Sequence, residues 1–138
     1  MAKKNINDLD ISNICCIGAG YVGGPTMAVM AGYCKNINFN VVDLNQSRID
    51  QWNDNNLDLL PVFEPGLREI IKDSRNKNLF FSNNIKEEIE KADMIFISVN
   101  TPIKSSGIGQ GQASDLSWVE SSAREIAKYA KGHTIVIE

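Results

Sequence analysis

The residues best suited to chemistry form a glycine-rich run near the N-terminus. Gly18, Gly20 and Gly23 are spaced as GxGxxG, directly after the apolar run 14–17, and the acid Asp43 follows twenty positions after the last glycine. In this spacing the first glycine permits a tight turn, the second lets backbone N–H groups approach a pyrophosphate, and the third lets a helix pack closely on the strand. The helix N-terminus adds the positive end of its dipole. The run therefore predicts a dinucleotide site at Gly18, Ala19, Gly20, Tyr21, Val22 and Gly23.

The acid indicates which dinucleotide to expect. Asp43 ends a second apolar stretch and can accept hydrogen bonds from the ribose hydroxyls of an adenosine, while its charge would repel a 2′-phosphate. Arg48 follows five residues later, and a nearby arginine can accommodate such a phosphate. We interpret Arg48 as lying beside the adenosine, with a solvated helix residue as the alternative. The sequence therefore predicts NAD, and not NADP, as the cofactor.

Length, charge and cysteine usage exclude several other classes of protein. The chain has 138 residues, 43% of them hydrophobic and 22% charged, which suits one globular domain. A net charge of −3 gives no basic surface for nucleic acid or membrane, and no apolar run is long enough to span a bilayer. No apolar stretch follows the basic residues Lys3 and Lys4, so we expect no leader sequence and a cytoplasmic location. Cys15, Cys16 and Cys34 lack metal-ligand spacing, so we expect reduced thiols and no metal site. The only histidine, His133, fits a solvated turn.

Apolar strands and amphipathic helices alternate in an order that would position these groups. We expect strands over residues 11–17, 39–43, 79–81, 94–99 and 134–137, and helices over 22–33, 46–53, 65–74, 85–91 and 116–129. The expected helix caps are Asn45, Asn83 or Asn84, and Asp115, and Trp52 is expected in the core and not as a cofactor platform. Right-handed crossovers then predict an α/β fold of the Rossmann type, a doubly wound parallel sheet with strand order 3-2-1-4-5.

A second binding segment follows the fourth expected strand. Ligands of such sheets bind at the carboxyl ends of the strands, where the order reverses between the first strand and the fourth. Asn100 and Thr101 can donate and accept hydrogen bonds there, and Pro102 fixes the exit of the chain, with an ordinary strand-ending turn as the alternative. Residues 103–114 have three glycines and no periodicity, so we expect them to be mobile or ordered only by a ligand or partner.

Several longer segments resemble one known family. They are ICCIGAGYVGGPT at 14–26, VVD at 41–43 with Arg48, EPGL at 64–67, NLFFS at 78–82 and ISVNTP at 97–102. Together they resemble the eukaryotic UDP-glucose 6-dehydrogenases over nearly everything after residue 11. The resemblance implies a cytoplasmic enzyme that uses NAD to oxidise UDP-glucose to UDP-glucuronate by two hydride transfers. The implied cofactor residues are Gly18 to Gly23, Asp43, Arg48, Val99, Asn100, Thr101, Pro102 and Ile103, the last standing where the family often has threonine.

The resemblance also implies functions that these residues do not carry. The family continues into a linker and a second domain, which holds the catalytic cysteine, lysine and acids and the UDP-sugar pocket. We therefore expect residues 1–138 to be the NAD-binding domain of a longer enzyme, homo-oligomeric when complete, and we assign no catalytic residue within it. Two alternatives stay open: a related UDP-N-acetylmannosamine dehydrogenase, and a stand-alone NAD-binding module.

Overall fold

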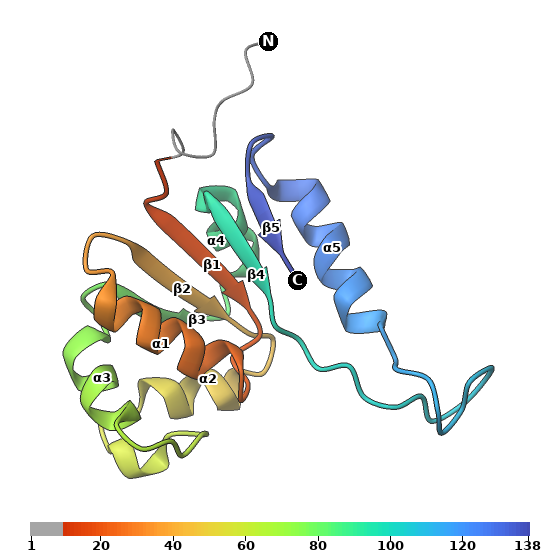
Figure 1. The fold of residues 1–138 in the computed structure, drawn as a ribbon, viewed down its shortest axis with the longest axis horizontal. Coiled ribbons are helices and arrows are strands. Elements are labelled where there is room, and N and C mark those ends of the chain that lie inside the picture. Colours follow the sequence, from red (N-terminus) through yellow and green to blue (C-terminus); the bar gives the residue numbers. More distant parts are fainter. Residues whose placement is uncertain (1–9) are drawn as a thin grey trace.

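Five parallel strands form one sheet in the order β3-β2-β1-β4-β5 (Figure 1). The computed structural model describes residues 10–138. The strands are β1 (Asn13–Ile17), β2 (Asn38–Val42), β3 (Leu79–Ser82), β4 (Met94–Ile97) and β5 (Ile135–Ile137). The order reverses between β1 and β4, which confirms the predicted doubly wound sheet and places its switch point beside the glycine run.

Helices cover both faces of this sheet and give it two apolar cores. The helices are α1 (Gly23–Tyr33), α2 (Gln46–Asn53), the short 3-10 helix η2 (Leu57–Leu59), α3 (Leu67–Ser74), α4 (Ile85–Lys91) and α5 (Ser117–Tyr129). Apolar side chains of α1, α2 and α3 pack on one face, and those of α4 and α5 pack on the other (Figure 1). No helix within residues 10–138 is long and apolar enough to cross a membrane.

The adjacent cysteines of β1 point to opposite faces, as alternation along a strand requires. Cys16 belongs to the core under α1, and Cys15 belongs to the core under α4 and α5. Burial raises the pKa of the Cys16 thiol to about 12, and burial also raises the pKa of Cys15 far above its ordinary value. Both thiols therefore stay protonated at neutral pH and serve as small core residues. Among the residues that the structure describes, no group of His, Cys, Asp or Glu side chains is arranged to hold a metal ion.

The helix starts confirm one predicted cap and correct others. The side-chain oxygen of Asn45 accepts a hydrogen bond from the Arg48 N–H at 3.1 Å, which confirms Asn45 as the cap of α2. Asn84 occupies the N-cap position of α4, as predicted, but its side chain makes no capping hydrogen bond. The Asn83 side chain instead donates to the Gln46 amide oxygen at 2.6 Å. Acidic residues in the first turn of α4 complement the helix dipole in place of a capping hydrogen bond.

Two further helices begin later than predicted. Helix α3 begins at Leu67 and not at Pro65, because Gly66 has φ = 83° and its left-handed backbone cannot continue a helix from the proline. Helix α5 begins at Ser117, with Leu116 at the capping position. Asp115 still accepts a hydrogen bond from the Ser117 N–H at 3.0 Å. It therefore pairs with an N–H group of the first turn of α5, although it lies one residue before the capping position.

The segment 103–114 forms an irregular hairpin that projects away from the sheet (Figure 1). Ile103 and Ser114 form an antiparallel bridge, and the Lys104 N–H donates to the Ala113 carbonyl at 2.8 Å. Its three glycines all have positive φ, between 75° and 85°, a backbone conformation that fits neither a helix nor a strand. The structure thus gives the segment hydrogen bonds of its own, and its mobility stays a prediction.

Asp93 joins three segments at the amino-terminal edge of the sheet. One carboxylate oxygen accepts hydrogen bonds from the N–H groups of Ser12 and Asn13, at 3.0 and 2.9 Å, and the other accepts from the Lys131 ammonium at 3.0 Å. Burial alone would raise the pKa of Asp93, but these hydrogen bonds and the charge of Lys131 outweigh it, so the pKa lies below its ordinary value. The charged form of Asp93 therefore stabilises the fold.

We expect Asp93→Ala to lower the free energy of unfolding by about 1–3 kcal/mol at neutral pH, because three donors lose their acceptor. Since the folded-state pKa is lower than the unfolded one, the wild-type contribution is present above about pH 4 and is lost as the pH falls through the folded value. Denaturant titrations at several pH values measure it. Asp73→Ala, which removes an exposed carboxylate from α3, is the charge-matched control, and equal losses from the two variants would contradict the role of Asp93.

Candidate dinucleotide-binding site

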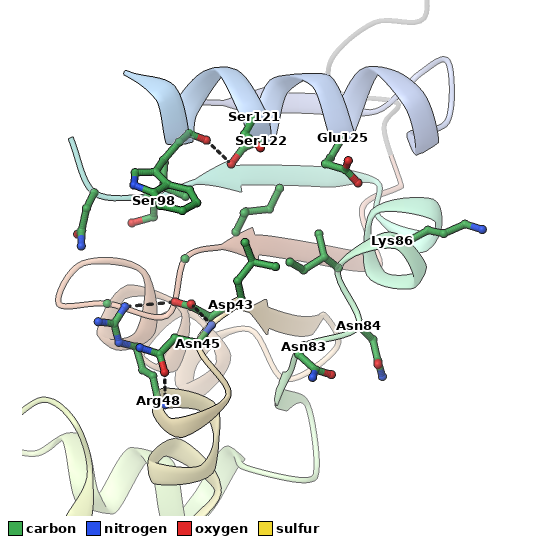
Figure 2. Close-up of a pocket in the computed structure, with 18 of the residues that line it drawn as sticks. Asp43, Asn45, Arg48, Asn83, Asn84, Lys86, Ser98, Ser121, Ser122 and Glu125 are labelled. Atoms are coloured by element: carbon green, nitrogen blue, oxygen red, sulfur yellow. Dashed lines mark hydrogen bonds and ion pairs between the residues drawn. The ribbon is translucent and has the colours of Figure 1, made fainter. Parts of the chain in front are cut away.

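A cleft of about 870 Å³ opens where the carboxyl ends of the strands meet α4 and α5 (Figure 2). Residues that follow β1, β2, β3 and β4 all contribute to its walls, since parallel strands end at the same edge of the sheet. The residues that line it are Ile17, Gly18, Gly20, Asp43, Leu44, Asn45, Arg48, Asn83, Asn84, Ile85, Lys86, Glu87, Glu90, Ser98, Val99, Asn100, Trp118, Ser121, Ser122 and Glu125.

The three glycines of the run meet three different steric demands. Gly18 has φ = 112°, and a side chain there would collide with the carbonyl of Ser98 at the end of β4. Gly23 lies so close to β1 that a Cβ would collide with the Gly18 carbonyl. Gly20 differs, because a Cβ there would meet nothing within 4 Å and would point into open space beside the cleft. The tight turn and the close helix packing are therefore present as predicted, and the space at Gly20 fits an incoming phosphate group.

Asp43 lies directly after β2 and already holds the glycine run in place (Figure 2). One of its carboxylate oxygens accepts from the Ala19 N–H at 2.9 Å and from the Arg48 guanidinium at 3.3 Å. The other accepts from the Asn45 N–H at 2.8 Å. A carboxylate offers about four acceptor positions, so these contacts leave capacity for a ribose hydroxyl. The Asp43 side chain is 13% exposed, which keeps its charge close to the cleft and partly shielded from water.

The structure brings some of the predicted site residues into the cleft and places others outside it. The predicted residues that line the cleft are Gly18, Gly20, Asp43, Arg48, Val99 and Asn100. Ala19 and Gly23 are buried beneath the loop, while Tyr21 and Val22 are 79% and 69% exposed at the start of α1. Thr101, Pro102 and Ile103 are exposed on the segment that leaves the sheet. Direct cofactor contacts from residues in these last two groups stay a prediction.

Sequence reasoning missed the wall that α5 contributes. Trp118, Ser121, Ser122 and Glu125 line the cleft from this helix, and Figure 2 labels the last three. Their spacing of i, i+3, i+4 and i+7 is that of one helix face, so the sequence did hold a signal. The Ser122 hydroxyl donates to the Trp118 carbonyl at 2.8 Å and is thereby satisfied within the helix, whereas the Trp118 side chain is 51% exposed. An exposed indole beside a cleft offers a flat apolar surface to a ligand.

The arrangement is suited to binding a nucleotide and, in the described part of the chain, includes neither a cysteine nor a histidine. It combines the N-terminus of α1, a carboxylate, amide side chains and apolar surfaces, which together match phosphate, ribose and base. Among the described residues, the exposed Cys34 follows the far end of α1, and His133 precedes the amino end of β5, so both lie at the opposite edge of the sheet. No sulfur or imidazole nucleophile therefore reaches the cleft from residues 10–138.

The fold and this cleft define a dinucleotide-binding domain of the doubly wound class. The family model described as the NAD-binding domain of the UDP-glucose/GDP-mannose dehydrogenase family matches residues 12–138. This chain belongs to that family, as its NAD-binding domain. The glycine run and Asp43 lie within the matched region. The family is described as binding NAD, as the sequence predicted.

Individual relatives support the same assignment. The UDP-glucose 6-dehydrogenases of Bos taurus and Drosophila melanogaster are 53% and 57% identical to this chain over 129 and 125 residues, which are 94% and 91% of it. The chain spans only 26% of the length of each. A ternary complex of GDP-mannose dehydrogenase from Pseudomonas aeruginosa matches 82% of this chain and 24% of its own, with a TM-score of 0.63 and 32% identity. The predicted family resemblance and the Rossmann-type fold are thus confirmed.

Proposed function

We propose that this domain serves a UDP-glucose 6-dehydrogenase, which oxidises UDP-glucose to UDP-glucuronate with two molecules of NAD. The observation that carries the proposal is the 51–57% identity to enzymes of that name, well above the 32% identity to a GDP-mannose dehydrogenase. Because the same domain occurs in relatives with other sugar nucleotides, it supplies the cofactor site, and the choice of sugar belongs to the remainder of such an enzyme.

The proposed cofactor pose follows the geometry of the cleft. The pyrophosphate lies against the glycine run and the N-terminus of α1, where N–H groups and the helix dipole favour negative charge. The adenosine ribose lies beside Asp43 and Arg48. The nicotinamide half extends toward Val99, Asn100, Thr101, Pro102 and Ile103, at the point where the strand order reverses. The bound cofactor accepts hydride at its nicotinamide ring, and the residues of this domain bind and orient it.

The proposal includes partners and a location. UDP-glucose and further copies of the same polypeptide are the proposed partners, in the cytoplasm. A related UDP-N-acetylmannosamine dehydrogenase and a stand-alone NAD-binding module are the competing functions, and the experiments below separate a dehydrogenase domain from a stand-alone module.

We expect calorimetric titration to show that NAD+ binds this chain, and we expect no NADH absorbance when UDP-glucose is added, because neither a cysteine nor a histidine of residues 10–138 reaches the cleft. Failure to bind NAD+ would contradict the cofactor site. Formation of NADH would contradict our view that these residues carry no catalysis.

A chimera tests whether this domain can serve a UDP-glucose 6-dehydrogenase. Residues 12–138 should replace the matching residues of the Bos taurus enzyme without abolishing UDP-glucose-dependent formation of NADH. The unaltered bovine enzyme is the control. A chimera that binds NAD+ but does not oxidise UDP-glucose would favour the stand-alone module.

A further inference from the structure

We propose that Trp52 is a positioning residue, which aims the N–H of Gly20 at the cofactor phosphates by holding the neighbouring carbonyl of Ala19. Trp52 lies on α2 and is fully buried. Its indole nitrogen donates a hydrogen bond to the Ala19 carbonyl at 2.8 Å, across 33 positions of sequence. The inference rests on the proposed cofactor site and adds the device that sets its shape.

Because the peptide bond is planar, this contact also sets the direction of the Gly20 N–H. In a trans peptide the carbonyl and the N–H of the same unit point in opposite directions. The Ala19 carbonyl and the Gly20 N–H share one unit, so directing the carbonyl at the buried indole directs the N–H away from it. Gly20 lines the cleft, and within residues 10–138 its N–H donates to no protein group. A free backbone donor is thereby held ready for an anion.

The peptide unit before Ala19 is held as well. The Ala19 N–H donates to the Asp43 carboxylate at 2.9 Å. Asp43 and Trp52 therefore hold the two successive peptide units that flank Ala19, one from the residue after β2 and the other from α2. A loop fixed in this way loses little further freedom on binding, which is the benefit of preorganisation.

Trp52 is itself held too firmly to turn away. Its ring is stacked on Phe81, with centroids 4.7 Å apart and planes 3° from parallel. The ring also lies against α1 so closely that a Cβ at Gly24 would collide with it. Arg75 donates to the carbonyls of Trp52 and Asp54 at 2.7 and 2.8 Å, which closes the C-terminal end of α2. The indole N–H thus has one direction available to it, toward Ala19.

The test separates positioning of the loop from a general contribution to the core. Trp52→Phe keeps an aromatic ring and removes the donor, so we expect NAD+ and ADP to bind about tenfold more weakly. Adenosine, which has no phosphate and does not need the Gly20 N–H, should bind as it does to the wild type. Phe39→Leu is the control, because Phe39 is fully buried in the same core but is remote from the loop; it should lower stability and leave NAD+ affinity unchanged.

Each result supports or overturns the inference. Calorimetry measures NAD+ and ADP, and NMR titration measures the weaker binding of adenosine. An unchanged NAD+ affinity in Trp52→Phe would overturn the positioning role of Trp52. An equal loss of affinity for adenosine would also overturn it, because that would indicate collapse of the whole site. If Trp52→Phe does not fold, 3-benzothienylalanine at position 52, in which sulfur replaces the N–H at nearly the same volume, gives the same comparison. Absence of NAD+ binding by the wild type would instead contradict the proposed function itself.

Discussion

Asp43→Ala should weaken NAD+ binding by about 10- to 100-fold, the effect of removing about 1.5–3 kcal/mol of hydrogen bonding to a charged group. NADP+ binding should change far less, because the lost hydrogen bonds are offset by relief of repulsion at the 2′-phosphate. The difference between the affinities for NAD+ and NADP+ therefore becomes smaller. Part of the NAD+ loss comes from the loop, since Asp43 also holds the Ala19 N–H and the Arg48 guanidinium.

Calorimetric titration of the wild type and of Asp43→Ala with NAD+ and with NADP+ measures this effect. Asp50→Ala is the matched control, because it removes one exposed carboxylate from α2 outside the cleft. It should leave both affinities unchanged. If the wild type bound NAD+ and NADP+ equally well, the assignment of Asp43 as the discriminating group would have to be abandoned.

Alanine at Gly18 and alanine at Gly20 should separate folding from binding. At Gly18 the backbone has φ = 112° and a Cβ would collide with the Ser98 carbonyl, so Gly18→Ala should lower the free energy of unfolding by about 2–5 kcal/mol. At Gly20 a Cβ meets no atom within 4 Å, so Gly20→Ala should change stability by no more than about 0.5 kcal/mol. The same methyl group occupies the space proposed for the pyrophosphate, and NAD+ affinity should fall by about tenfold or more.

Denaturant unfolding and NAD+ titration of the two variants test both statements. Wild-type affinity in Gly20→Ala would place the pyrophosphate elsewhere in the cleft. Wild-type stability in Gly18→Ala would mean that the end of β4 shifts at little cost, and the close contact between β1 and β4 would then not account for this glycine.

The sequence alone was sufficient for the topology and for the first half of the site. A GxGxxG run after an apolar strand and an acid after the next strand are patterns that can be recognised without knowing how the chain packs. The alternation of apolar strands with helices, together with right-handed crossovers, then leaves the order 3-2-1-4-5 as the expected sheet. The adjacent cysteines follow the same logic, because side chains alternate along any strand.

Features that depend on packing between distant segments came only from the tertiary structure. Helix α5 forms a wall of the cleft because the sheet brings it beside α4, although the spacing of its residues already marked a face. Asn84 is the N-cap residue of α4 without a side-chain capping bond, and the Asn83 side chain bonds to Gln46, which lies 37 positions away. Trp52 was expected in the core, and it is there, but its hydrogen bond to Ala19 has no local signature. Local patterns determine which elements form, whereas long-range hydrogen bonds depend on side-chain directions that only the packed structure sets.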